Sequence, residues 1–184
     1  TNSATPIKVL SISNAQAIAA SLYSTYVLLK DGSVYSFGYN GYGHLGDSTT
    51  TNRTTAVRMK KGVYPGTSFI GDDANNPIIK ISAGGYHFLS LAADGKVYSV
   101  GYNAYGHLGD NTTSDRYVPV KMVKGQYIGN TDLGDDISNP IIAIAGGLNT
   151  SMALDASGLV YSIGYNGVGQ LGDGTSTNRV TPVK

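Results

Sequence analysis

The sequence predicts an all-β protein made of three tandem four-stranded units, and three observations lead to this fold class. A single pattern recurs along the chain, with Gly-Tyr-Asn beginning at positions 38, 101 and 164, each 63 residues after the last. Gly and Tyr are abundant, with 25 and 14 residues, as expected where tight turns join half-buried strands. Long stretches of the best helix-forming residues are missing.

The middle unit shows the order of the elements. Residues 78–82 and 86–93 predict the first two strands and residues 96–103 the third, with Asp94-Gly95 as a hairpin signal of type I′, in which both central residues have positive φ. Residues 117–122 predict the fourth strand, and its proline favours a sheet edge, where no ladder donor is needed. Four antiparallel strands in each tandem unit correspond to one blade of a β-propeller.

The repeat also divides the chain. Thr5-Pro6-Ile7-Lys8 is similar to Thr181-Pro182-Val183-Lys184, so the N-terminal part is expected to hold the tail strand of a preceding unit. The predicted boundaries are 1–17 for this tail strand and linker, 18–77 for repeat 1, 78–140 for repeat 2 and 141–184 for repeat 3.

Two long inserts, residues 62–77 and 125–140, share Gly-Asp-Asp and Asn-Pro. We expect them to be surface excursions at the blade edge, where binding loops usually lie.

The motifs of the middle unit resemble those of one known family. They are Ile81-Ser82-Ala83-Gly84-Gly85, then Asp94-Gly95-Lys96-Val97-Tyr98-Ser99, and then GYNAYGHLGD over residues 101–110. These motifs resemble the regulator of chromosome condensation (RCC1) repeat, in its bacterial RCC1-like form, along essentially the whole chain. The resemblance implies a seven-bladed β-propeller. Because propellers have roughly four to eight blades, three blades form a partial propeller or part of a larger array.

Composition excludes several classes of function. The formal charge is +1, from 13 basic and 12 acidic residues, which gives no reason to expect nucleic acid or an anionic membrane surface as partner. Without cysteine there is no disulfide, thiolate metal site or cysteine nucleophile. No apolar run is long enough to insert into a membrane. Abundant Thr, Ser, Asn, Gly and Tyr are typical of a secreted or cell-surface bacterial protein.

Two histidines, His44 and His107, occupy the same position in successive units, and Gln170 stands there in the third. We retain them as candidate binding residues, although hydrogen bonding to turn backbone is favoured over metal ligation or catalysis. No unit holds a symmetry-breaking cluster of titratable groups. The sequence therefore predicts no catalytic residue, no metal site, no cofactor and no enzyme.

Acidic residues recur in two settings. Asp47, Asp110 and Asp173 each precede an arginine by six residues, which predicts a structural ion pair in every unit with Arg53, Arg116 and Arg179. The acids of the inserts are candidate binding residues, and calcium is one candidate ligand because it prefers oxygen donors. A plain turn is the favoured alternative. These candidates are Asp72, Asp73, Asp135 and Asp136.

Tyrosines flank the Gly-Tyr-Asn loop, and packing between blades is the favoured role for them. Tyr42 and Tyr105, with Val168 as the third equivalent, are expected to present a face to a partner, and a glycan is one candidate ligand. Asn52 and Asn111 lie in polar loops as glycosylation sequons, whereas the sequon at Asn149 is expected in a strand.

The expected function is a non-enzymatic protein-interaction or structural scaffold. Its partner is another protein or further copies of itself, joined through open blade edges into a ring or fibre. The alternative, taken from the family resemblance, is a nucleotide-exchange factor of a small GTPase.

Overall fold

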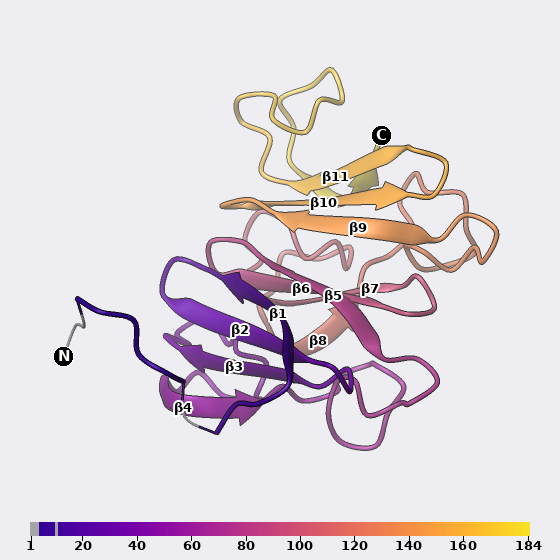
Figure 1. Ribbon diagram of the computed structural model, residues 1–184. Coiled ribbons are helices and arrows are strands. Elements are labelled where there is room, and N and C mark those ends of the chain that lie inside the picture. The colour runs from indigo at the N-terminus through magenta and orange to yellow at the C-terminus, as the bar shows by residue number, and fades with distance from the viewer. Residues whose placement is uncertain (1–3, 10) are drawn as a thin grey trace.

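The structure is a computed structural model that describes residues 4–9 and 11–184, and these form three four-stranded antiparallel sheets (Figure 1). Each sheet is one blade. Blade 1 holds β1 (Ala15–Ala20), β2 (Ser24–Leu29), β3 (Val34–Gly38) and β4 (Arg53–Arg58); blade 2 holds β5 (Ile78–Ala83), β6 (His87–Ala92), β7 (Val97–Gly101) and β8 (Arg116–Lys121); blade 3 holds β9 (Ile141–Gly146), β10 (Thr150–Asp155), β11 (Val160–Gly164) and β12 (Arg179–Val183).

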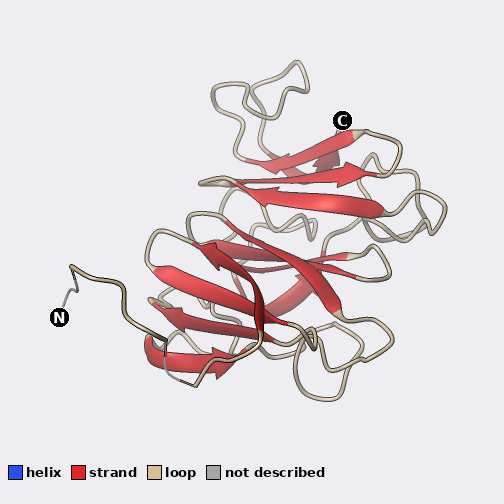
Figure 2. Ribbon diagram, in the orientation of Figure 1, coloured by secondary structure: helices blue, strands red, loops and turns tan. Residues whose placement is uncertain are grey.

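The described residues contain strands and loops only (Figure 2). None of them belongs to a helix that could span a bilayer. The predicted all-β class, with four strands in each unit, is confirmed.

The strands of each blade lie in sequence order, so the first strand is at one edge and the fourth at the other. β5 contacts both β1 and β9, which gathers the first strands of all three blades on one side (Figure 1). The fourth strands form the outer edges. This is the arrangement of neighbouring propeller blades.

The Asp94-Gly95 turn forms where the sequence predicts it, but its type differs. Gly95 has a φ of 86°, whereas Asp94 is not among the residues with positive φ. The Gly95 N–H donates to the Ala92 carbonyl and the Ala92 N–H to the Lys96 carbonyl, both at 3.0 Å. The prediction of a type I′ turn was wrong, because a longer loop with a single left-handed glycine already supplies the twist that the strands need.

The proline of the fourth strand lies at the predicted edge. In blade 2, Ser99 pairs with Val120 and Gly101 pairs with Arg116, and the register shifts between these pairs. Pro119 falls in the shifted stretch, where the absence of its N–H breaks no regular ladder. Its carbonyl accepts a hydrogen bond from the Val63 N–H of the blade 1 insert, at 3.0 Å.

The inserts are more than surface excursions. Tyr64 and Ile70 of the first insert are 1% and 0% exposed, and Tyr127 and Leu133 of the second are 3% and 0% exposed. The Tyr64 ring lies edge-on to Tyr98 of blade 2, at 5.4 Å between centroids. Each insert therefore fills the joint between its own blade and the next, and the expectation of purely exposed loops was wrong.

The apolar core lies between the blades. One cluster joins Tyr26 and Leu28 of blade 1 to Phe88 and Val100 of blade 2, and a second cluster joins blades 2 and 3. The Tyr26 and Phe88 rings stack at 4.5 Å. Each blade is thus apolar on both faces and depends on its neighbours for burial.

Near the N-terminus, Ile7, Lys8 and Val9 lie beside Phe37 and β4. Residues 4–9 have no assigned strand. Residues 1–3 and 10, which belong to the expected tail strand and linker, lie outside the described residues. The tail strand, whose own blade would precede this sequence, stays a prediction.

Candidate binding surface

Seven tyrosines form a continuous row across the loop ends of the three blades, which we call the tyrosine row. Tyr42 of blade 1 contacts Tyr86 and Tyr102 of blade 2, at centroid distances of 5.0 and 4.9 Å. Tyr105 of blade 2 contacts Tyr165 of blade 3 at 5.0 Å. Its members are Tyr23, Tyr39, Tyr42, Tyr86, Tyr102, Tyr105 and Tyr165.

The tyrosine row combines packing with exposure. Tyr23 and Tyr39 are 67% and 36% exposed, and the other five rings are half-buried. The rings therefore pack between blades, as the sequence favours, and still present an aromatic surface. A hollow of about 330 Å³ opens along the row, lined by Leu22, Tyr42, Tyr86, Tyr102, Tyr105, Leu148 and Asn149.

A buried asparagine holds each loop that carries these rings. Asn40 is fully buried, and its amide nitrogen donates to the carbonyls of Thr49 and Thr51 at 3.0 and 3.2 Å. Its side-chain oxygen accepts from the Leu45 N–H at 2.9 Å. Asn103 and Asn166 repeat this network in the other blades. Since a buried amide must satisfy its donors and acceptor, the loop is fixed around it.

The predicted Asp–Arg pairs are present in every blade. The Arg53 Nε donates to Asp47 Oδ2 at 2.6 Å, and the equivalent bonds of Arg116 to Asp110 and of Arg179 to Asp173 have the same length. The pKa of Asp173 falls to about 2, first because the Thr175 hydroxyl donates to its carboxylate, with Arg179 adding to the effect against partial desolvation. These pairs stabilise the loops, as predicted.

The three histidines are buried rather than exposed. His44, His87 and His107 are each 0% exposed. His44 Nε2 lies 2.8 Å from the Ser24 hydroxyl, and His87 Nε2 lies 3.0 Å from the Ser151 hydroxyl of blade 3. Since both side chains are closed off from solvent, the candidate binding role of His44 and His107 stays a prediction that their burial does not favour. The sequence pattern indicates a polar turn at this loop position, whereas in the structure the position packs against the next blade.

Burial keeps these histidines neutral. Desolvation lowers the pKa of His44 and of His107 to about 4, against weaker support from backbone hydrogen bonds. Desolvation also lowers the pKa of His87 well below its usual value, and the neighbouring His107 and His44 lower it further.

The acids of the inserts are used within their own loops. Asp72 accepts hydrogen bonds from the Ser68 and Phe69 N–H groups and pairs with Arg58 at 2.7 Å. Asp135 caps the second insert in the same way.

The neighbouring acids also form turns. Asp73 accepts from the Asn75 N–H, and Asp136 accepts from the N–H and hydroxyl of Ser138. Among the described residues, no group of three or more His, Asp or Glu side chains is placed to hold a metal ion. The geometry therefore supports turns rather than a calcium site.

The sequons differ in their settings. Asn52 is exposed, but its side-chain oxygen accepts from the Asn40 N–H at 2.8 Å and so closes the loop. Asn111 is exposed with a φ of 62°. Asn149 lies in the turn before β10, not in a strand as expected.

Sequence reasoning missed two members of the tyrosine row. Tyr23 and Tyr86 lie in the turn between the first and second strands, away from the Gly-Tyr-Asn loop. They are equivalent positions of repeats 1 and 2, and this shared tyrosine was the available signal.

Two family models, both described as the regulator of chromosome condensation (RCC1) repeat, match the chain. One matches residues 15–43, 78–106 and 141–170, and the other matches residues 31–91 and 94–154, which is more than half of the chain. The chain belongs to the RCC1 repeat family. The resemblance to RCC1 repeats is confirmed, and the three sheets are RCC1-type blades, while the bacterial form and the seven-bladed ring stay predictions.

Among curated proteins, the chain is 30% identical over 183 residues to the human probable E3 ubiquitin-protein ligase HERC4, covering 97% of this chain and 15% of that protein. It is 29% identical over 168 residues to the ultraviolet-B receptor UVR8 of Arabidopsis thaliana, covering 91% of this chain and 33% of UVR8. The RCC1-type chain thus spans a third or less of these relatives, and only repeat regions are compared.

Solved structures show the same fold. Human WBSCR16 gives a TM-score of 0.73 at 21% identity, over 92% of this chain and 39% of that one. Yeast RCC1 (Prp20), solved with bound Kap60, gives 0.72 at 22% identity, over 95% and 38%. At these identities, the likenesses show the fold of the chain and assign it no role or partner.

Proposed function

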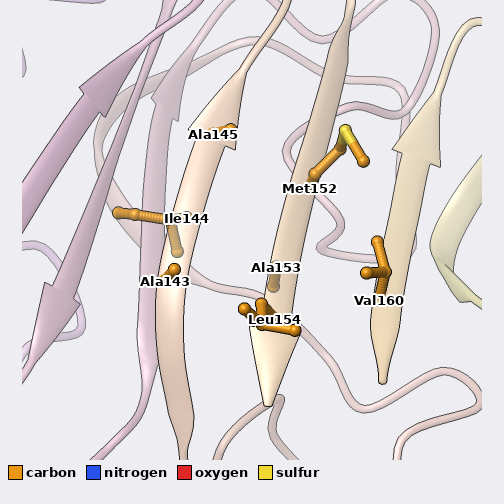
Figure 3. A pocket seen from close by; sticks show the side chains of 7 residues that line it. All are labelled: Ala143, Ile144, Ala145, Met152, Ala153, Leu154 and Val160. Carbon is orange, nitrogen blue, oxygen red and sulfur yellow. The ribbon is translucent and has the colours of Figure 1, made fainter. Parts of the chain in front are cut away.

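We propose that this RCC1-type chain is a non-enzymatic scaffold that self-associates, with blade 3 of one copy packing against blade 1 of another. The observation that carries the proposal is the open outer face of blade 3, where the large apolar residues Met152, Leu154 and Val160 have buried counterparts in blades 1 and 2. We call it the next-blade face, and it is formed by Ala143, Ala145, Met152, Leu154 and Val160 (Figure 3).

Equivalent positions in the three blades show what this face is built for. Met152 is 43% exposed, whereas its counterparts Tyr26 and Leu89 are both fully buried. Val160 is 48% exposed, whereas Val34 and Val97 are 0% and 1% exposed. In blades 1 and 2 the following blade covers these positions, so the face of blade 3 has the shape and chemistry of an inter-blade contact.

Blade 1 offers the complementary surface. Ile18 is 77% exposed, whereas its counterparts Ile81 and Ile144 pack against the inter-blade cores. Tyr35 and Phe37 of β3 are only half-buried, while Tyr98 and Val100 at the same positions of blade 2 are 1% and 0% exposed. We call this surface of Ile18, Tyr35 and Phe37 the previous-blade face.

Contact between two different faces is heterologous. Such a contact repeats from copy to copy, and it gives a ring if the rotation closes and a fibre if it does not. A further repeat of a longer polypeptide would cover the same face by the same contacts, so the test uses the 184-residue chain by itself.

Light scattering after size-exclusion chromatography tests the proposal. We expect a mass above the 19.2 kDa of one chain that rises with concentration. Met152→Asp places a charge on the next-blade face and is expected to give monomers. Ile137→Asp is the matched control, because Ile137 is 89% exposed in the second insert. A wild-type chain that stays monomeric at all concentrations would rule the proposal out.

We also propose a location for the protein and retain one alternative function. The abundance of Thr, Ser, Asn and Gly supports a secreted or cell-surface location. Regulation of a small GTPase is the alternative function, and a nucleotide-release assay separates it: acceleration by the chain supports the alternative, and an unchanged rate supports the scaffold.

A further inference from the structure

From the tyrosine row we infer a second binding site, which takes an extended proline-rich peptide of a partner protein. The row lies at the loop ends of the blades, whereas the next-blade and previous-blade faces lie on their flanks. It stays exposed when further blades are added, so this inference does not rest on self-association.

The phenol hydroxyls of the row are free to bind a ligand. Within the described part of the chain, none of the seven makes a hydrogen bond, although each ring packs against another. A proline-rich peptide presents carbonyl acceptors and few N–H donors, since proline has none. An array of hydroxyl donors on an apolar surface matches that pattern.

The tilt of the rings favours a ridged ligand over a flat one. Neighbouring rings stand at 53° between Tyr42 and Tyr86, 55° between Tyr42 and Tyr102, and 62° between Tyr105 and Tyr165. Tilted rings in contact form a ridged wall along the hollow of the row, and aromatic-lined grooves receive a polyproline II helix. A sugar ring or a base stacks best on a flat ring face, which tilted neighbours interrupt.

The lack of charged residues in the hollow further restricts the chemical class of the partner. The hollow along the row is lined by tyrosine, leucine and Asn149 only. Without a cation there, a nucleic-acid backbone has no counter-charge in this hollow. A neutral, apolar and acceptor-rich peptide satisfies the surface.

The length of the row sets the size of the ligand. Consecutive rings from Tyr39 through Tyr42, Tyr102 and Tyr105 to Tyr165 are 4.9 to 6.3 Å apart. This line of five rings therefore extends over at most about 22 Å, which about seven residues of polyproline II cover at about 3.1 Å per residue. The six prolines of this sequence are all isolated, so none of these 184 residues supplies such a peptide.

A labelled ten-residue polyproline peptide tests the inference by fluorescence anisotropy, with a Gly-Ser peptide of equal length as control. We expect saturable binding of the polyproline peptide only. Tyr42→Ala, at the contact of blades 1 and 2, is expected to weaken binding at least about tenfold. Tyr42→Phe keeps the ring and removes the hydroxyl, and it is expected to weaken binding about threefold. Tyr117→Phe, at a ring that is 47% exposed outside the row and outside both blade faces, is the matched control.

Wild-type protein with isotope-labelled tyrosine rings gives an answer independent of any variant. The peptide is expected to shift the NMR signals of the row and to leave the buried Tyr98 and Tyr161 unchanged. No binding at millimolar peptide, equal binding by Tyr42→Ala and wild type, or shifts outside the row would overturn the inference. So would saturable binding of cellohexaose or oligothymidine to the row in place of polyproline.

Discussion

The imidazole rings of His87 and His107 lie 4.5 Å apart, and both are fully buried in blade 2, where the Ser151 hydroxyl of blade 3 contacts His87 Nε2. His44 Nε2 meets the Ser24 hydroxyl within blade 1, while its Cβ faces Gly101 of blade 2. Protonation of these buried rings therefore weakens the joints between blades.

This burial predicts a loss of stability in mild acid. Above pH 6.5 the histidines are neutral in the folded and the unfolded chain. Below pH 6.5 the histidines of the unfolded chain bind protons, whereas His44 and His107 of the folded chain stay neutral down to about pH 4. Each such histidine lowers the free energy of unfolding by about 2 kcal/mol between pH 7.5 and pH 5.

Urea unfolding at the two pH values measures this loss. All 12 acidic residues are aspartates, and the reference pKa of that side chain in peptides, about 3.9, lies below this window, so we expect histidine to dominate it. His44→Gln, the residue that Gln170 supplies in repeat 3, is expected to reduce the loss by about 2 kcal/mol. Equal stability of the wild type at pH 7.5 and pH 5 would contradict the prediction.

Gly101 is predicted to be intolerant of a side chain. A Cβ there would lie 2.4 Å from the Tyr86 carbonyl oxygen and 2.6 Å from His44 Cβ. Gly158→Ala is the matched control, because Gly158 also has positive φ but has no atom within 4 Å of an added Cβ. Thermal unfolding is expected to show that Gly101→Ala costs about 2 kcal/mol more than the control. Equal costs would show that only backbone strain matters.

The loop ion pair is predicted to stabilise each blade. Asp110 accepts from Arg116, from Asn103 and from the N–H and hydroxyl of Thr112. Asp110→Asn removes the charged acceptor and is expected to cost about 2 kcal/mol in urea unfolding. Asp73→Asn, whose amide oxygen can still accept the bond from the Asn75 N–H, serves as control and is expected to be nearly neutral. A reversed order of the two effects would refute the assignment.

Calcium is predicted to leave the protein unchanged. The carboxylates of Asp72 and Asp135 are occupied by backbone N–H donors of their own inserts. We expect the same melting temperature with calcium and with a chelator, and no heat in calorimetric titration. A raised melting temperature that Asp135→Asn abolishes would restore the calcium interpretation.

Local patterns gave most of the fold. Strand positions and the edge strand could be predicted because their signals lie in the sequence itself. These signals are the 63-residue repeat, the hairpin turns and Pro119. The burial of Tyr64 and Ile70 could not, because their insert has the Gly, Asn and Pro of a surface loop. Their partner, Tyr98, belongs to the next blade.

The residues of the binding surface also differ in how far they could be predicted from the sequence. Tyr42 and Tyr105 were identifiable because they stand in a repeated loop, but Tyr86 joins them only when β6 brings it beside the loop of the preceding blade. The complete burial of the histidines could not be predicted from the sequence, because a loop position lies in the joint between blades only once the next blade packs against it.

Mixing two single-face variants tests the central claim of head-to-tail association most directly. Met152→Asp blocks the next-blade face and Ile18→Asp blocks the previous-blade face, so each variant alone is expected to be a monomer by light scattering. Their equimolar mixture retains one intact pair of faces and is predicted to form a dimer, with no larger species. A mixture that remains monomeric, or a single variant that still associates, would contradict the head-to-tail contact.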